Sequence, residues 1–157
     1  MKRWIHALEL KVPPAVVFLA IAGGMKLLES TCPFASFEMP GRRPLAILLL
    51  ATGGLLGAAG IGSFLRAHTT VLPHRPQKAT TLVTGGIYRI SRNPMYVGLL
   101  FVLGGWSVAL SNGLAMFLLP GFVAYLDRFQ IRPEEEALRA RFGEKFDAYA
   151  RTTRRWL

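Results

Sequence analysis

One stretch of the chain limits its fold more than any other. Residues Leu45 to Leu65 form 21 consecutive positions without a charged side chain. A helix of this length spans the roughly 30 Å hydrocarbon core of a bilayer. Its glycines recur at spacings that let neighbouring helices approach closely, and Arg66 ends the run. We therefore expect an integral membrane protein in which this stretch is one membrane helix.

Composition and charge exclude several classes of function. The 157-residue chain is 52% hydrophobic and carries a formal net charge of +10. Its basic residues flank apolar runs instead of lining one helix face, which disfavours nucleic-acid binding. It has a single cysteine, Cys32, and three scattered histidines, His6, His68 and His74. We expect no metal site, and we expect the histidines to lie at the membrane interface.

Three further apolar runs accompany the long one. They are Val12 to Leu28, Met95 to Leu110 and Leu114 to Leu126. The last two are short for full spans and are separated by a turn at residues 111–113, which predicts a tight helical hairpin. The pattern predicts an all-α integral membrane protein with about four membrane helices and C-terminal cytoplasmic helices. We expect one domain over residues 1–157, with the first two membrane helices in residues 1–66 and the rest in residues 67–157.

The charged segments indicate the topology. The start (Met1 to Lys11), the loop Ala67 to Asn93 and the C-terminal tail (Asp127 to Leu157) are all rich in bases. The segment between the first two spans has a net charge of zero. The positive-inside rule then places both termini in the cytoplasm, so the loop and the tail lie on one side and are able to meet. The small size favours a bacterial inner membrane.

The loop and the tail offer complementary chemistry. The loop region contains glycines and two tyrosines, Tyr88 and Tyr96, whereas the tail carries three consecutive carboxylates, Glu134 to Glu136. Carboxylates beside aromatic rings suit a cationic ligand. Each group also has a plainer interpretation, because tyrosines populate interfacial belts and glutamates populate exposed helix starts. The residues themselves indicate a polar, cation-binding pocket at the cytoplasmic face.

Two motifs in the second half of the chain occur in a specific order. The first is Gly86-Ile87-Tyr88-Arg89 followed by Arg92-Asn93-Pro94-Met95-Tyr96-Val97-Gly98, and the second begins at Glu134-Glu135 and continues through Leu138, Phe142-Gly143, Phe146 and Tyr149. Together they resemble the isoprenylcysteine carboxyl methyltransferase family, whose relatives include phospholipid N-methyltransferases. The match covers about half of the chain, from Leu82 onward. It implies a membrane methyltransferase that uses S-adenosylmethionine, whose sulfonium is a cation.

The resemblance also implies roles for individual residues. The implied cofactor-binding residues are Val83, Thr84, Gly86, Tyr88, Asn93, Pro94, Tyr96, Gly98, Glu134, Glu135, Arg155 and Trp156. The implied catalytic residues are Arg128, Arg132 and Glu135, with one of the two arginines orienting an acceptor carboxylate. The chain departs from the family in two places. Asn93 stands where eukaryotic members usually have a histidine. Gln130 stands where they have an arginine, four residues before the first glutamate, with Arg128 and Arg132 on either side.

The activity implied is in-line methyl transfer to a lipophilic acceptor that enters from the bilayer. A prenylcysteine-like carboxylate is one candidate acceptor. Alignment of the reactants and exclusion of water would be the protein's main contribution, since positioning alone supplies roughly 7–11 kcal/mol. Two alternatives stay open at this point. One is a membrane reductase of the sterol-reductase type that uses NADPH, and the other is a non-catalytic lipid-binding protein.

Overall fold

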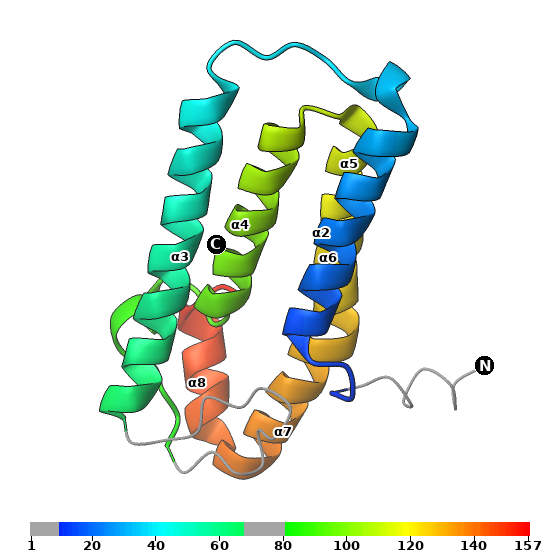
Figure 1. Cartoon of the computed structure of the whole chain (residues 1–157). Helices are drawn as coiled ribbons and strands as arrows, with labels where there is room; N and C mark the ends of the chain where they lie inside the picture. Colours follow the sequence, from blue (N-terminus) through cyan, green and yellow to red (C-terminus); the bar gives the residue numbers. More distant parts are fainter. Residues whose placement is uncertain (1–9, 68–80) are drawn as a thin grey trace, which may run out of the picture.

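The computed structural model describes residues 10–67 and 81–157 of the chain (Figure 1). Four helical segments lie side by side: α2 (Pro14–Thr31), α3 (Arg42–Arg66), α4 (Pro94–Leu110) and a longer run that begins with α5 (Gly113–Met116) and α6 (Leu118–Leu126). Short 3-10 turns, η1 (Pro33–Ala35) and η3 (Gly86–Arg89), lie in the connections. The predicted all-α class is confirmed for these residues. The expectations for residues 1–9 and 68–80, with His6, His68 and His74, lie outside the described residues.

The apolar helices are those of an integral membrane protein. Three helical segments in the described residues are long and apolar enough to cross a bilayer: Pro14–Thr31, Arg42–Arg66 and Gly113–Phe142. The fourth, α4, is apolar but has 17 residues. At 1.5 Å per residue it extends about 26 Å, slightly less than the hydrocarbon core. The expected count of four membrane helices is therefore not confirmed by helix length.

The last membrane helix continues into the tail. The sequence predicted an apolar run that ends at Leu126, but the helical segment extends from Gly113 to Phe142. It passes through a π-helical turn, η4 (Asp127–Ile131), into α7 (Arg132–Phe142), and α8 (Glu144–Thr152) follows Gly143. Pro133 has no N–H for the carbonyl of Phe129 four residues earlier. The backbone N–H of Leu10 donates to that carbonyl instead, at 3.1 Å.

The turn between α4 and α5 is confirmed at residues 111–113. Ser111 adopts a left-handed backbone conformation with φ 49°. The Asn112 side chain accepts a hydrogen bond from the backbone N–H of Ala115, which caps α5, and its Nδ2 donates to the carbonyl of Cys32 at 3.0 Å. The turn therefore joins the hairpin to the end of α2, at the end of the bundle opposite α7 and α8 (Figure 1).

Glycines allow α3 and α4 to pack closely. A Cβ atom on Gly53 would lie 2.6 Å from the carbonyl oxygen of Gly98, and one on Gly98 would lie 2.7 Å from that of Gly53. No larger side chain fits between the two backbones. On the other side of α4, α2 and α6 complete an apolar core that includes Tyr96, Leu103 and Phe122.

Candidate functional site

The loop and the tail meet at one end of the bundle, where α7 and α8 lie (Figure 1). The backbone N–H of Arg92 donates to the carbonyl of Arg154 at 2.9 Å. The side chains of Ser91 and Asn93 both donate to the carbonyl of Arg155, at 3.3 and 2.9 Å. Residues about 60 positions apart in sequence therefore form one hydrogen-bonded junction at the base of α4.

Two tyrosines, Tyr88 of η3 and Tyr149 of α8, connect the loop to α8. Gly86 begins η3 with φ 61°, a conformation that suits glycine. The ring of Tyr88 then packs edge-on against Phe64 of α3, with centroids 5.4 Å apart. The hydroxyl of Tyr149 on α8 donates to the carbonyl of Tyr88 at 2.7 Å. Burial raises the pKa of both hydroxyls, so both stay protonated at neutral pH and neither acts as a base.

Glu135 lies at the centre of an ion-pair network. Arg92 of the loop donates to its Oε1 from Nη2 at 2.7 Å, and Arg155 of the tail donates to its Oε2 from Nη2 at 2.6 Å. Arg155 also donates to Asp127 at 2.8 Å. Hydrogen bonding to Glu135 raises the pKa of Arg155 further above its ordinary value. Glu135 is buried, and its charge is already balanced within the chain.

Arg92 also fastens the end of the tail. Its Nη1 donates to the carbonyl of Ala150 at 3.1 Å and to the carbonyl of Thr153. One guanidinium therefore binds a carboxylate on α7 and two carbonyls at the end of α8. Because so many of its donors are used, Arg92 holds the junction closed and has little capacity left for a ligand.

Glu134 has a different environment from its neighbour. Its carboxylate accepts a hydrogen bond from the hydroxyl of Tyr96 on α4. In the described part of the chain it forms no salt bridge. The residue belongs to α7, is at least half-buried and contacts Tyr96 of α4. Glu134 therefore differs from Glu135 in that its hydrogen-bond partner is a neutral hydroxyl and not a guanidinium.

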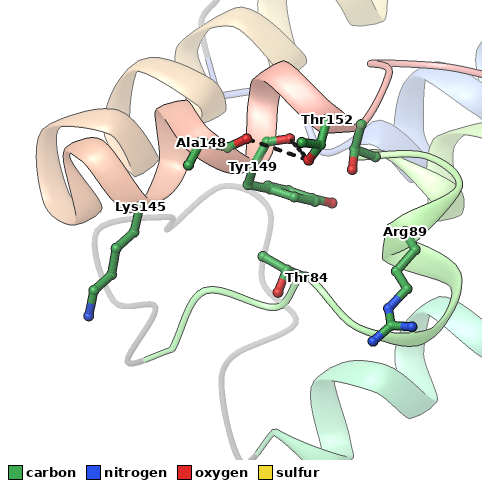
Figure 2. Close-up of a pocket in the computed structure, with 7 residues that line it drawn as sticks. Thr84, Arg89, Lys145, Ala148, Tyr149 and Thr152 are labelled. Atoms are coloured by element: carbon green, nitrogen blue, oxygen red, sulfur yellow. Dashed lines mark hydrogen bonds between the residues drawn. The ribbon is translucent and has the colours of Figure 1, made fainter.

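A pocket of about 570 Å³ opens between the loop and α8 (Figure 2). Its lining consists of Thr84, Arg89, Lys145, Ala148, Tyr149, Thr152 and Thr153. Figure 2 shows Arg89 and Lys145 at opposite sides of it, with Thr84 between them. Of the residues that the resemblance assigns to cofactor binding, Thr84 is in this lining. The lining includes two bases, Arg89 and Lys145, and no carboxylate, and Glu134 is not part of it.

The other residues assigned from the sequence fall into two groups. Val83, Gly86, Tyr88, Asn93, Pro94, Tyr96 and Arg155 belong to the junction or to the elements that carry it, and Trp156 packs against the apolar core. Gly98 instead faces α3, where its lack of a side chain serves helix packing. Arg132 pairs with Asp127 at 3.0 Å, and the guanidinium of Arg128 lies 5.5 Å from the ring centroid of Phe129.

Sequence reasoning missed several residues of the junction. Arg92 and Tyr149 lie in the two motifs but were given no role of their own, and neither Ser91 nor Asp127 was assigned one. The available signal was the position of Arg92 inside the first motif, next to Asn93 and Pro94. No cluster of three or more His, Cys, Asp or Glu side chains in residues 10–67 and 81–157 is arranged to hold a metal.

Comparisons with known proteins relate the sequence of this chain to one family. A family model described as phospholipid methyltransferase matches residues 42–145, which extend from the start of α3 into α8. An uncharacterized protein of Haemophilus influenzae is 38% identical over 63 residues, which are 40% of this chain and the whole length of that relative. No solved structure matches the chain.

Proposed function

This chain belongs to the phospholipid methyltransferase family, and we propose that it transfers a methyl group from S-adenosylmethionine to a lipophilic acceptor in the bilayer. One observation supports this choice most strongly. Glu134 presents an acidic side chain that accepts a hydrogen bond from the hydroxyl of Tyr96 and lies next to Glu135 of the junction of loop and tail. The sulfonium and ammonium groups of the cofactor are cations, so the chemistry of this residue fits the group.

Different residues would hold different parts of the cofactor. Glu134 and Tyr96 would bind its cationic end, and the loop segment with Val83, Thr84 and Gly86 would line its adenosine. Asn93 and Pro94 begin α4 against the carbonyl of Arg155, so they would shape the wall of the site. Glu135 and Arg155 are bonded to each other, and Trp156 packs on the core, so these three would keep the tail in place.

When bound, S-adenosylmethionine supplies an electrophilic methyl group. The chain's contribution is then to align an acceptor with this methyl group and to exclude water. The hydroxyls of Tyr88 and Tyr149 are protonated, so we assign them no role as a base. A role for Arg128 or Arg132 in orienting an acceptor carboxylate stays a prediction of the resemblance. The same holds for Gly98 as part of the cofactor wall.

The placement in the cell is also a proposal. Loop and tail lie at one end of the bundle and carry many bases, which supports a cytoplasmic location for that end. A cofactor made in the cytoplasm would reach the junction from water, while the acceptor would arrive from lipid. We infer a bacterial inner membrane with both termini in the cytoplasm.

Isothermal titration of the detergent-purified full chain tests the cofactor. We expect micromolar binding of S-adenosylmethionine and no binding of NADPH. Binding of NADPH alone would support a reductase, and binding of neither would support a non-catalytic lipid-binding protein. Incubation with methyl-labelled S-adenosylmethionine and a bacterial lipid extract then tests transfer, because label should appear in the organic phase.

A further inference from the structure

The pocket between the loop and α8 has a chemistry that the proposed function does not use. Its lining contains two bases, Arg89 of η3 and Lys145 of α8, and no carboxylate. The cationic end of S-adenosylmethionine needs negative charge, and Glu134 lies outside this lining. The pocket therefore suits an anion, and its ligand is a molecule other than the methyl donor.

Neither base has its charge balanced by the described part of the chain. Within residues 10–67 and 81–157, Arg89 and Lys145 form no salt bridge and no side-chain hydrogen bond. Of the acids near Lys145 in the sequence, Glu144 is not in the lining, and Asp147 pairs with Arg139 at 2.8 Å. Both bases are exposed, so a ligand is able to reach them.

The two bases lie apart from each other. Figure 2 shows Arg89 and Lys145 at opposite sides of the pocket, with Thr84 between them. The volume of about 570 Å³ is in the range of small-molecule sites and exceeds what one compact anion fills. A ligand that meets both bases therefore carries two separate negative groups.

The pocket lies at the level where a membrane helix ends. The ring of Tyr88 in η3 packs 5.4 Å from that of Phe64, near the end of α3. The apolar side chains of Leu65 and Ile90 are 63% and 60% exposed, as lipid-facing residues are, and Ile90 directly follows Arg89. Arg89 is therefore close to the boundary between apolar chains and head groups, where basic pockets attract anionic phospholipids.

We propose that this pocket binds an anion with two phosphate groups, one held by Arg89 and the other by Lys145. A guanidinium binds a phosphate through two parallel hydrogen bonds, and an ammonium binds one as a point charge. The level of the pocket favours a lipid head group as the source, and a soluble diphosphate offers the same chemistry. The site is separate from that of methyl transfer and does not depend on the proposed function.

A ligand of this kind would connect the loop to the tail. Arg89 belongs to η3 and Lys145 lies at the start of α8, so one molecule bound to both holds these elements together. A ligand that binds only the folded chain raises its stability. Thermal unfolding is therefore a direct readout of binding.

Unfolding of the detergent-purified full chain, followed by circular dichroism, tests the site. Cardiolipin, which has two phosphates, is compared with phosphatidylglycerol, which has one, at equal total phosphate, and phosphatidylcholine gives the background. We expect cardiolipin at ten times its Kd to raise the midpoint by about 3–6 °C, and phosphatidylglycerol to raise it less. Equal shifts would overturn the inference, because single phosphates would then be sufficient.

Sodium pyrophosphate and orthophosphate, compared at equal ionic strength, separate a soluble source from a lipid. A shift with cardiolipin alone identifies a lipid head group as the ligand. A shift with pyrophosphate that exceeds the shift with orthophosphate identifies a free diphosphate. Either result supports the site, and the absence of a specific shift with both cardiolipin and pyrophosphate overturns it.

Three variants locate the binding. Arg89→Gln and Lys145→Gln each remove one base from the lining, and we expect each to weaken cardiolipin binding about tenfold, the range of a hydrogen bond to a charged group. Arg151→Gln is the matched control, because Arg151 is an exposed base on α8 outside the lining. Equal weakening in all three would mean that cardiolipin responds to overall charge, and would overturn the site.

S-adenosylmethionine separates this site from that of the cofactor. Isothermal titration should give Arg89→Gln and Lys145→Gln the wild-type affinity for S-adenosylmethionine, and cardiolipin should still raise the midpoint when the cofactor is present. Displacement of cardiolipin by the cofactor would place both in one pocket and overturn the inference. Failure of the wild type to bind S-adenosylmethionine would instead refute the proposed function and leave this site standing.

Discussion

Tyr96 on α4 donates its hydroxyl hydrogen to Glu134 on α7, and this bond joins a membrane helix to the charged tail. The adjacent carboxylate, Glu135, is bound by Arg92 and Arg155 instead. Two neighbouring glutamates therefore have different tasks. One has a neutral partner and suits a cationic ligand, and the other holds the loop and the tail together.

Glu134→Gln should weaken binding of S-adenosylmethionine about tenfold or more, because an amide is not able to supply the carboxylate proposed to pair with the cationic cofactor. Isothermal titration measures the affinity. Glu136→Gln is the matched control, since Glu136 is exposed on the same helix. Equal affinities for Glu134→Gln and the wild type would show that the cofactor's charge is bound elsewhere.

Glu135→Gln should chiefly destabilise the fold. It leaves the guanidinium groups of Arg92 and Arg155 without their shared countercharge, and breaking a buried ion pair from one side costs about 3 kcal/mol or more. Thermal unfolding in detergent, followed by circular dichroism, should show a lower midpoint than for Glu136→Gln. An unchanged midpoint would mean that Glu135 does not hold the loop and the tail together, and would favour the cofactor-binding role that the resemblance implies for it.

Hydropathy and charge placement were enough to predict the helical class, the turn at residues 111–113 and the meeting of loop and tail. Each depends on a property that the sequence carries directly. A run such as Leu45 to Leu65 has few stable alternatives in a bilayer, and bases at both ends of the chain restrict the topology.

The division of work between Glu134 and Glu135 was not predictable. Adjacent residues of a helix point about 100° apart, so which carboxylate meets Arg92 depends on how α7 is rotated relative to α4. The continuous helix from Gly113 to Phe142 was missed for a related reason. The sequence becomes polar from Asp127 onward, but a change from apolar to polar residues does not break a helix. A helix is therefore able to continue past the end of its apolar part.

The glycines of α3 give a matched test of the helix packing. Gly53→Ala should destabilise the protein by about 1–3 kcal/mol, because its Cβ would lie 2.6 Å from the oxygen of Gly98 and 2.9 Å from the nitrogen of Val102, both backbone atoms. A Cβ atom on Gly54 would have no other heavy atom within 4 Å, so Gly54→Ala should be neutral or stabilising by up to about 1 kcal/mol. Similar unfolding midpoints for the two variants would contradict the α3–α4 contact.

The hydroxyls of Tyr88 and Tyr149 should lose their protons only at unusually high pH. Burial raises the pKa of Tyr88 and Tyr149, so folding favours their protonated forms. This contribution to stability is present below the ordinary tyrosine pKa of about 10 and is lost only as the pH rises through the higher folded values. The tyrosinate difference spectrum between wild type and Tyr149→Phe should therefore stay flat up to about pH 10. A midpoint at or below that pH would mean that Tyr149 is open to water.

Hydrogen exchange of the full chain in nanodiscs, with and without S-adenosylmethionine, tests most directly whether loop and tail enclose one cofactor. Peptides from residues 81–93 and from residues 144–157 should both gain protection when the cofactor is added, while peptides from α5 and α6 should not change. Protection confined to one of the two segments, or absent from both, would contradict a shared site.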